Sequence, residues 1–240
     1  MQQIIVSFRL SWGALLLRDK AYADVRDAPS PFIQGLTAVV VISILASLAA
    51  VVGQSLAWAT SPSLSAMRDI VWKGMQKMPW YQELSDDAAF IEQFRQWFNL
   101  GWEVLPWLFG APHPLGAVIG VVTRPVGLLI FWLVYGVLAH LSARIVGGHA
   151  KLEQTLGCTA LAIAPQLLNF VHLLPYVQVG CIVGVWSLVC DYVALKNAHH
   201  LSWARTFWAT ILPLIIMGIA LAAFIALLIA AGMAISSQGE

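Results

Sequence analysis

Long apolar stretches alternate with short polar segments along the chain. Five of these stretches hold about 20 mostly apolar residues, the length that a helix needs to cross a bilayer. They cover residues 32–58, 116–141, 156–173, 177–195 and 207–235. Arg124 and Pro125 interrupt the second stretch near its start, so four full spans with one partial helix is an alternative. The pattern therefore predicts an all-α integral membrane protein, a bundle of about five transmembrane helices plus amphipathic surface helices.

Residues 4–20 have helical periodicity without being apolar throughout. Apolar side chains recur at helical spacing at Ile5, Phe8, Trp12 and Leu15, and the cations Arg9, Arg18 and Lys20 lie at other positions. This pattern is typical of a helix that lies on the cytoplasmic surface of a membrane. The two prolines in the run 27–31 should end this segment before the first span.

The segment 59–114 contains two further amphipathic patterns. The first has apolar residues at Met67, Val71, Met75 and Met78, and the second carries an aromatic stripe after an N-cap near Asp87. Tryptophan prefers the headgroup region of a membrane, and five of the eleven tryptophans lie here, at Trp72, Trp80, Trp97, Trp102 and Trp107. We expect two helices along the outer membrane surface, over the ends of the spans, with Trp97, Trp102 and Trp107 at the interface. The alternative is a small soluble outer domain.

Lys and Arg residues are distributed unequally between the segments that connect the spans. With the N-terminus inside, the cytoplasmic segments hold Arg9, Arg18, Lys20, Arg26, Arg144, Lys151, Lys196 and Arg205. The outer cations all lie in the long loop, and the short outer turn and the C-terminal tail hold none. Because these cations are enriched in cytoplasmic connections, we expect a cytoplasmic N-terminus and an extracytoplasmic C-terminus.

The predicted organisation has five parts. They are a cytoplasmic amphipathic segment (1–30), a first transmembrane helix (31–58), an extracytoplasmic loop with two Trp-rich helices (59–114), a four-helix transmembrane region (115–235) and a tail (236–240). The protein should therefore be a multi-pass protein of the cell membrane.

Composition narrows the possible functions. Hydrophobic residues make up 60% of the chain and charged residues only 10%, and the mean hydropathy is +0.79. The net charge of +1 gives no basic footprint for nucleic acid. The sequence has no phosphate-binding loop, no zinc-protease or nucleophile-elbow motif and no Cys-x-x-Cys pair, so we expect neither an enzyme nor a cofactor or metal site.

Small residues recur at the four-residue spacing that lets transmembrane helices approach closely. They are Gly116 with Gly120, Gly180 with Gly184, and the ridge Gly218, Ala222, Ala226 and Ala230. Such ridges predict helix packing within the bundle. A homo-oligomer or a membrane-protein partner is the alternative use of the same surfaces.

Polar residues inside the predicted spans are costly in lipid and are the candidates for a site. Gln166, Asn169 and His172 share one face of the third span, at about the depth of Arg124 on the second. Nearer the cytoplasmic face, we expect His140 and Asp191 to have similar depths, so that the two side chains form a pair. The alternatives are that Asp191 reaches the cytoplasmic interface or pairs with Lys196, and that Arg124 extends to the outer headgroups.

The second half of the chain resembles the Yip1 domain family of membrane proteins. The resemblance lies in Gly147-Gly148 after a span, Pro165 within the next span and a His-Leu-Ser segment at 200–202, all within residues 116–235. It implies a five-helix bundle with a cytoplasmic N-terminus. Eukaryotic members are linked to vesicle trafficking and small GTPases through a longer N-terminal region, whereas this chain looks like bacterial members of undefined role, in the inner membrane.

Three hypotheses follow for the function. The first is a non-enzymatic membrane scaffold or accessory subunit that holds a membrane-protein partner within the lipid bilayer. The second is a small permease or an ion or proton pathway along the intramembrane polar residues. The third is a lipid-binding or membrane-shaping protein that uses its surface helices.

Overall fold

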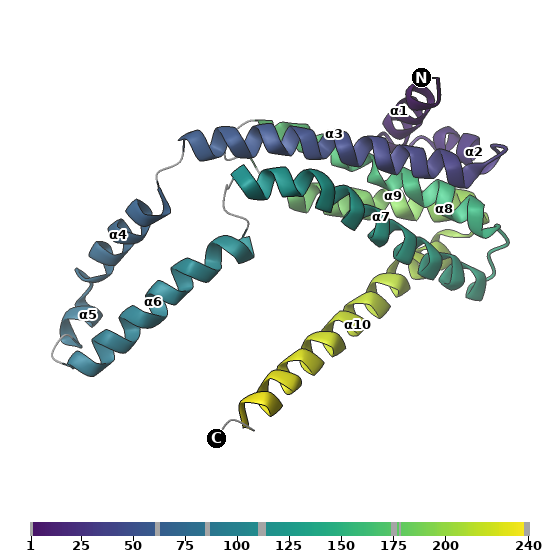
Figure 1. Cartoon of the computed structure of the whole chain (residues 1–240). Coiled ribbons are helices and arrows are strands. Elements are labelled where there is room, and N and C mark those ends of the chain that lie inside the picture. Colours follow the sequence, from purple (N-terminus) through teal and green to yellow (C-terminus); the bar gives the residue numbers. More distant parts are fainter. Residues whose placement is uncertain are drawn as a thin grey trace.

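The computed structural model describes residues 2–60, 63–84, 87–109, 114–173, 177 and 179–237, and within these residues every element is a helix (Figure 1). The elements, in chain order, are α1 Gln2–Leu15, α2 Asp19–Arg26, α3 Pro31–Thr60, α4 Leu64–Met75, α5 Pro79–Glu83, α6 Ala88–Phe109, α7 Pro114–Ile145, α8 Leu152–Ala160, the 3₁₀ helix η1 Leu161–Leu173, α9 Gly180–His199 and α10 Trp203–Ser237.

Four of these helices contain a stretch long and apolar enough to cross a membrane. The stretches are Pro31–Gly53, Ile119–Ile145, Gly180–His199 and Trp203–Leu227. They match the first, second, fourth and fifth predicted spans and confirm the all-α membrane fold. Although it contains Pro125, α7 continues as one helix through that residue.

The third predicted span has a different form from the one expected. It consists of α8, which has 9 residues, followed directly by η1, which has 13 residues and contains Pro165. Proline has no N–H to donate within an α-helix. Because a 3₁₀ helix rises further per residue than an α-helix, the two together extend about 40 Å, which exceeds the ~30 Å hydrocarbon core of a bilayer.

The α8–η1 unit forms the centre of the bundle. Residues 155–165 are all buried. The unit contacts α3, α7 and α9, and Figure 1 shows it running between them. Backbones approach closely where α3 crosses α8, because a Cβ on Gly35 would lie only 2.8 Å from the Cβ of Ala160.

Four of the glycines predicted to mediate packing make no contact with another helix among the residues that the structure describes. A Cβ at Gly180, Gly184 or Gly218 would meet no atom within 4 Å, and one at Gly120 would meet only the side chain of Arg124. The interpretation of these positions as internal helix contacts is therefore wrong, and their use in contacts with another chain stays a prediction. Gly116 lies outside the residues whose surroundings the structure describes.

The N-terminal helix α1 is present, and it also packs against the bundle. Its small residues Ser7, Ser11 and Ala14 are buried, and α1 packs against α3 and η1. Ile5, Phe8 and Trp12 face outward from the bundle. The periodicity predicted the helix. The side that packs against the protein carries Leu15 together with small residues, which allow closer approach than large ones. Placement of the outward side chains in the membrane surface stays a prediction.

The predicted helices of segment 59–114 are present as α4 and α6, with the short α5 between them. The backbone N–H of Phe90 donates to Asp87 Oδ1 over 3.0 Å, so the N-cap expected near Asp87 forms. The ring of Trp72 packs on those of Tyr81, Phe94 and Phe98, with centroids 5.0–6.2 Å apart. These helices form a hairpin that extends away from the bundle instead of covering the ends of the spans (Figure 1).

The predicted interfacial tryptophans differ in their surroundings. Trp97 is 64% exposed and lies outside the aromatic cluster, whereas Trp102 packs against Phe98. Trp107 lies outside the residues whose side chains the structure describes. Placement of these rings in the headgroup region stays a prediction.

The last helix, α10, packs against the bundle only through its beginning. Thr206, Ala209, Thr210 and Pro213 are buried, and the hydroxyl of Tyr135 donates to the carbonyl oxygen of Thr210 over 3.3 Å. Further along, residues 218–227 are all exposed. Figure 1 shows α10 diverging from α7 and α9 along its length. Its far half is therefore an apolar helix without neighbours in the described chain.

Candidate functional sites

A cavity of about 290 Å³ lies between α7, η1 and α9, beside the first half of α10. Its walls are mainly apolar and aromatic, and include Leu128, Phe131, Trp132, Ile163, Leu188 and Leu214. The polar side chains that line it are Tyr135, Thr159, Gln166, Ser187 and Asp191. An apolar cavity with a few convergent polar groups is the usual form of a small-molecule or ion site.

Asp191 supplies the acidic group of this cavity. The residue is only 8% exposed, and its Oδ1 atom has no hydrogen-bond partner among the described residues. The predicted alternative, a pair with Lys196, is wrong, because the Lys196 ammonium lies 3.8 Å from the ring centroid of Trp203. A carboxyl group in apolar surroundings is unstable as an unpaired charge, so it can hold a proton or attract a cation.

Gln166 joins Asp191 in lining the cavity, and Asn169 lies one turn further along η1. The amide nitrogen of Asn169 donates to Gln166 Oε1 over 2.5 Å, so two of the three predicted polar residues of the third span do interact. The prediction for His172 concerns a side chain that lies outside the described residues. The structure thus joins part of the predicted outer cluster to the cavity.

Arg124 does not take part in this cluster. Its side chain is exposed and runs back along α7, so that Nε lies 3.4 Å from the place of a Cβ on Gly120. This direction leads toward the beginning of α7. It is the geometry of a long cation that extends along its helix toward the headgroups, the alternative that the sequence allowed.

A second polar group joins α7, α8 and α9. The hydroxyl oxygen of Thr155 lies 2.9 Å from His140 Nδ1 and 2.9 Å from His199 Nε2. The backbone N–H of Ala150 donates to His199 Nδ1 over 3.3 Å. Because Nδ1 accepts this hydrogen bond, the neutral ring of His199 carries its proton on Nε2. The Nε2–H group then donates a hydrogen bond to the hydroxyl oxygen of Thr155.

This arrangement corrects the predicted pair of His140 and Asp191. His140 is level with His199, which lies eight residues after Asp191 and thus about 12 Å further along the axis of α9. Asp191 is instead level with Tyr135, which lines the same cavity. The prediction failed because two spans that run in one direction can be displaced along the membrane normal, and that displacement leaves no trace in either sequence.

Sequence reasoning also missed Thr155 and His199 as members of a polar group. Threonine is common in helices, so Thr155 did not stand out. His199 and His200 are adjacent and identical, and nothing in the sequence indicated that one would be buried and the other exposed. In the structure His199 is buried, whereas His200 is exposed and adopts a left-handed backbone conformation with φ 53°. The chain therefore turns sharply between the two histidines.

The described residues contain no group of three or more His, Cys, Asp or Glu side chains arranged as a metal site would require. In the threonine–histidine group the Thr155 hydroxyl is buried and hydrogen-bonded to both imidazoles, so these contacts join α7, α8 and α9. The polar side chains of the cavity can bind a proton, an ion or a polar group.

The comparisons with known proteins agree with this fold. The model of the Yip1 domain matches residues 12–225, a longer stretch than residues 116–235, which carried the resemblance in the sequence. No curated protein matches the chain. No solved structure matches it.

Proposed function

This chain belongs to the Yip1 domain family, and on that premise we propose that it is a non-enzymatic membrane scaffold or accessory subunit. Its partner is another membrane protein, which contributes an apolar transmembrane helix. That helix packs along the far half of α10, residues 215–230. The multi-pass fold supplies the frame that holds α10 in position.

One observation carries this proposal: the small-residue ridge of α10 is uncovered. Gly218, Ala222, Ala226 and Ala230 are all exposed, and a Cβ at Gly218 would meet open space. Helices in lipid associate through close packing over small residues, because lipid tails are as apolar as the side chains. A ridge that no described helix of the chain covers is thus suited to a helix of another chain.

The proposal is tested by purifying the full chain from native membranes in a gentle detergent and quantifying co-eluting proteins by mass spectrometry. Two double variants are compared with the wild type. Ala222→Leu with Ala226→Leu blocks the ridge. Ala220→Leu with Phe224→Leu places leucines at two exposed positions on the opposite side of α10 and serves as the control.

We expect a partner in stoichiometric amount with the wild type and the off-ridge variant, and at least about a tenfold loss with the ridge variant. A monomer without partners, or equal recovery with both variants, would contradict the proposal. Recovery of a pure homo-oligomer that the ridge variant dissociates would assign α10 to self-association instead of an accessory role.

The buried carboxyl group favours a second candidate function, an ion or proton pathway. Asp191 and Gln166 line the same cavity, and Asp191 Oδ1 is without a partner among the described residues. Intramembrane carboxyl groups are characteristic of proton and cation pathways. The polar lining between α7 and α9 is where such a pathway would pass.

Flux of protons or Na⁺ into liposomes that contain the purified protein tests this second candidate. Asp191→Asn keeps the shape of the side chain and removes its charge, so it should abolish the flux. Asp24→Asn, at an exposed position on α2, is the matched control and should leave the flux unchanged. Wild-type liposomes that are no leakier than protein-free ones would exclude the pathway.

A further inference from the structure

A second cavity, of about 500 Å³, lies at the end of the bundle where α8 begins. It is bordered by the end of α2, the loop after α7, the start of α8, the end of α9 and the first turn of α10. Its polar lining includes Arg26, Gln154, His149, His200, Ser202 and Arg205. The residues that this cavity gathers come from five separate segments, and neither proposed function uses them.

The lining of this cavity carries an excess of positive charge. Asp27 supplies the carboxylate, and the Arg26 guanidinium binds it through two hydrogen bonds of 2.8 and 2.7 Å. These bonds hold the pKa of the Asp27 carboxyl below its ordinary value, so Asp27 and Arg26 neutralise each other. Arg205 remains, and it makes no hydrogen bond or ion pair with any residue that the structure describes.

Backbone groups add to the positive potential. The first N–H groups of α10 follow Ser202 and have no partners inside the helix, and such a helix beginning is a common place for an anion. Gly147 has φ +96°, and Arg205 Nη1 lies 3.4 Å from the position that a Cβ on Gly147 would occupy. The loop without a side chain at this position lets the Arg205 guanidinium lie close to the backbone.

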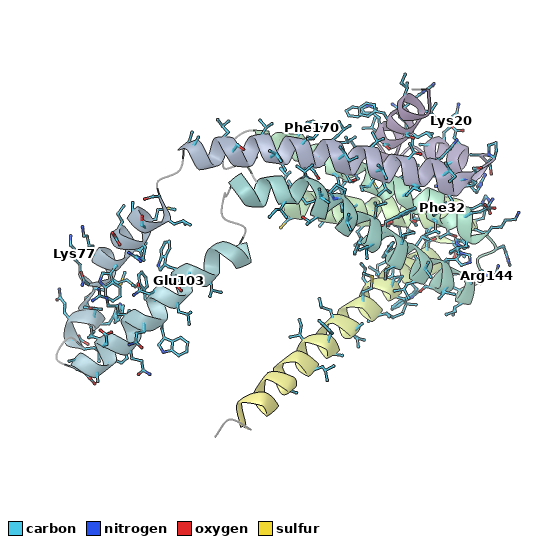
Figure 2. All side chains as sticks on the ribbon, viewed as in Figure 1. Lys20, Phe32, Lys77, Glu103, Arg144 and Phe170 are labelled. Carbon is cyan, nitrogen blue, oxygen red and sulfur yellow. The ribbon has the colours of Figure 1, made fainter. Side chains whose placement is uncertain are left out.

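The cavity lies at the depth of lipid headgroups. Two spanning stretches end next to it, at Ile145 and His199, and a third begins at Trp203. Trp203 and Trp208 are 66% and 54% exposed on the first turns of α10, and exposed tryptophans are typical of the membrane interface. Figure 2 shows Lys20 and Arg144 at the same end of the bundle.

We propose that this cavity binds the phosphate group of an anionic membrane lipid. Arginine binds phosphate through two parallel hydrogen bonds, and Arg205 is the guanidinium free to do so. The N–H groups at the start of α10 would complete the contacts on the phosphate oxygens. The lipid is the source of the phosphate because the cavity opens where the spans end, although a soluble phosphate ester has the same chemistry.

The test is native mass spectrometry of the full chain in detergent, titrated with short-chain phosphatidylglycerol or phosphatidylcholine. Arg205→Gln removes the free guanidinium, and Ser202→Tyr fills the cavity without changing the charge. Arg144→Gln is the matched control, since Arg144 is an exposed cation at the same end of the bundle but does not line the cavity. Thermal melting shows whether each variant is folded.

We expect one phosphatidylglycerol to bind more tightly than phosphatidylcholine, and Arg205→Gln and Ser202→Tyr each to weaken it about tenfold. A surface cation contributes only a general attraction, so Arg144→Gln should weaken binding by less than about fivefold. Equal losses from Arg205→Gln and Arg144→Gln would overturn the proposal, as would full binding by both cavity variants. If equimolar glycerol 3-phosphate displaces the lipid, the bound phosphate comes from a soluble ester, and the proposal of a lipid ligand is wrong.

Discussion

At the scale of single residues, the spacing of the helices in the bundle depends on glycines at positions where any larger residue would clash. A Cβ on Gly157 would lie 2.6 Å from the carbonyl oxygen of Pro31, and one on Gly136 would lie 2.6 Å from Leu156 Cδ2. The first contact is with backbone, which cannot rotate away. Gly157 therefore sets how closely the beginning of α3 approaches α8.

Gly157→Ala tests this close approach. The added methyl group forces α3 and α8 apart, and overpacking of this kind costs about 1–3 kcal/mol. The melting temperature in detergent should fall accordingly. Gly127→Ala is the control, because a Cβ on Gly127 in α7 meets no atom within 4 Å, and its melting temperature should stay unchanged or rise. Equal melting temperatures for the two variants would show that α3 and α8 can move apart at little cost in stability.

Thr155→Val tests the polar group that joins three helices. Valine matches threonine in shape but leaves the facing nitrogens of His140 and His199 without the hydroxyl group, which should cost about 1–3 kcal/mol of unfolding free energy. The control is Thr123→Val, where the exposed hydroxyl donates only to Ile119 of its own helix. If melting of the two variants is the same, the buried hydrogen bonds contribute little.

At the scale of elements, the α4–α6 hairpin depends on aromatic packing. Trp72 touches three rings, from α5 and α6, and Trp80 adds an edge contact on Phe94 with centroids 5.5 Å apart. α4 and α6 are both capped at their beginnings, by Ser63 and Asp87. Each helix is thus specified locally, whereas their mutual position depends on the rings.

Trp72→Ala should therefore loosen the hairpin and leave the bundle intact. Each aromatic pair contributes about 0.5–1.5 kcal/mol, so amide hydrogen exchange in α4 and α6 should become at least about tenfold faster. Trp97→Ala, at a ring outside the cluster, should leave exchange unchanged. Faster exchange in α3 or α7 of the Trp72 variant would show that the hairpin supports the bundle.

The elements were more predictable from the sequence than the contacts between them. Spans are recognisable because hydropathy is a property of each segment alone, and the cap at Asp87 is a local pattern. The pairing of His140 with Thr155 depends on the relative displacement of two helices, which neither segment encodes by itself. The same applies to Gly157, whose close neighbour lies in α3, and to Gly218, whose expected neighbour is absent from the described chain.

At the scale of the whole molecule, the topology depends on whether the α8–η1 unit crosses the membrane. Four spans of α-helical form would return the chain to the side from which it started. We expect the buried α8–η1 unit, with its length of about 40 Å, to add a crossing, which would place the two termini on opposite sides. The distribution of Lys and Arg then favours a cytoplasmic N-terminus.

Reporter fusions to the full chain test this topology. Green fluorescent protein fused to the N-terminus should fluoresce, because it folds in the cytoplasm, and alkaline phosphatase fused to the C-terminus should be active, because it needs an oxidising compartment. Alkaline phosphatase inserted after Lys77 in the outlying hairpin should match the C-terminal fusion, since both positions lie on the same predicted side. The contrary outcome is an active phosphatase at Lys77 and an inactive one at the C-terminus. It would mean that α8–η1 enters the membrane without crossing it. The direction of α10 across the membrane would then be the opposite of the predicted one.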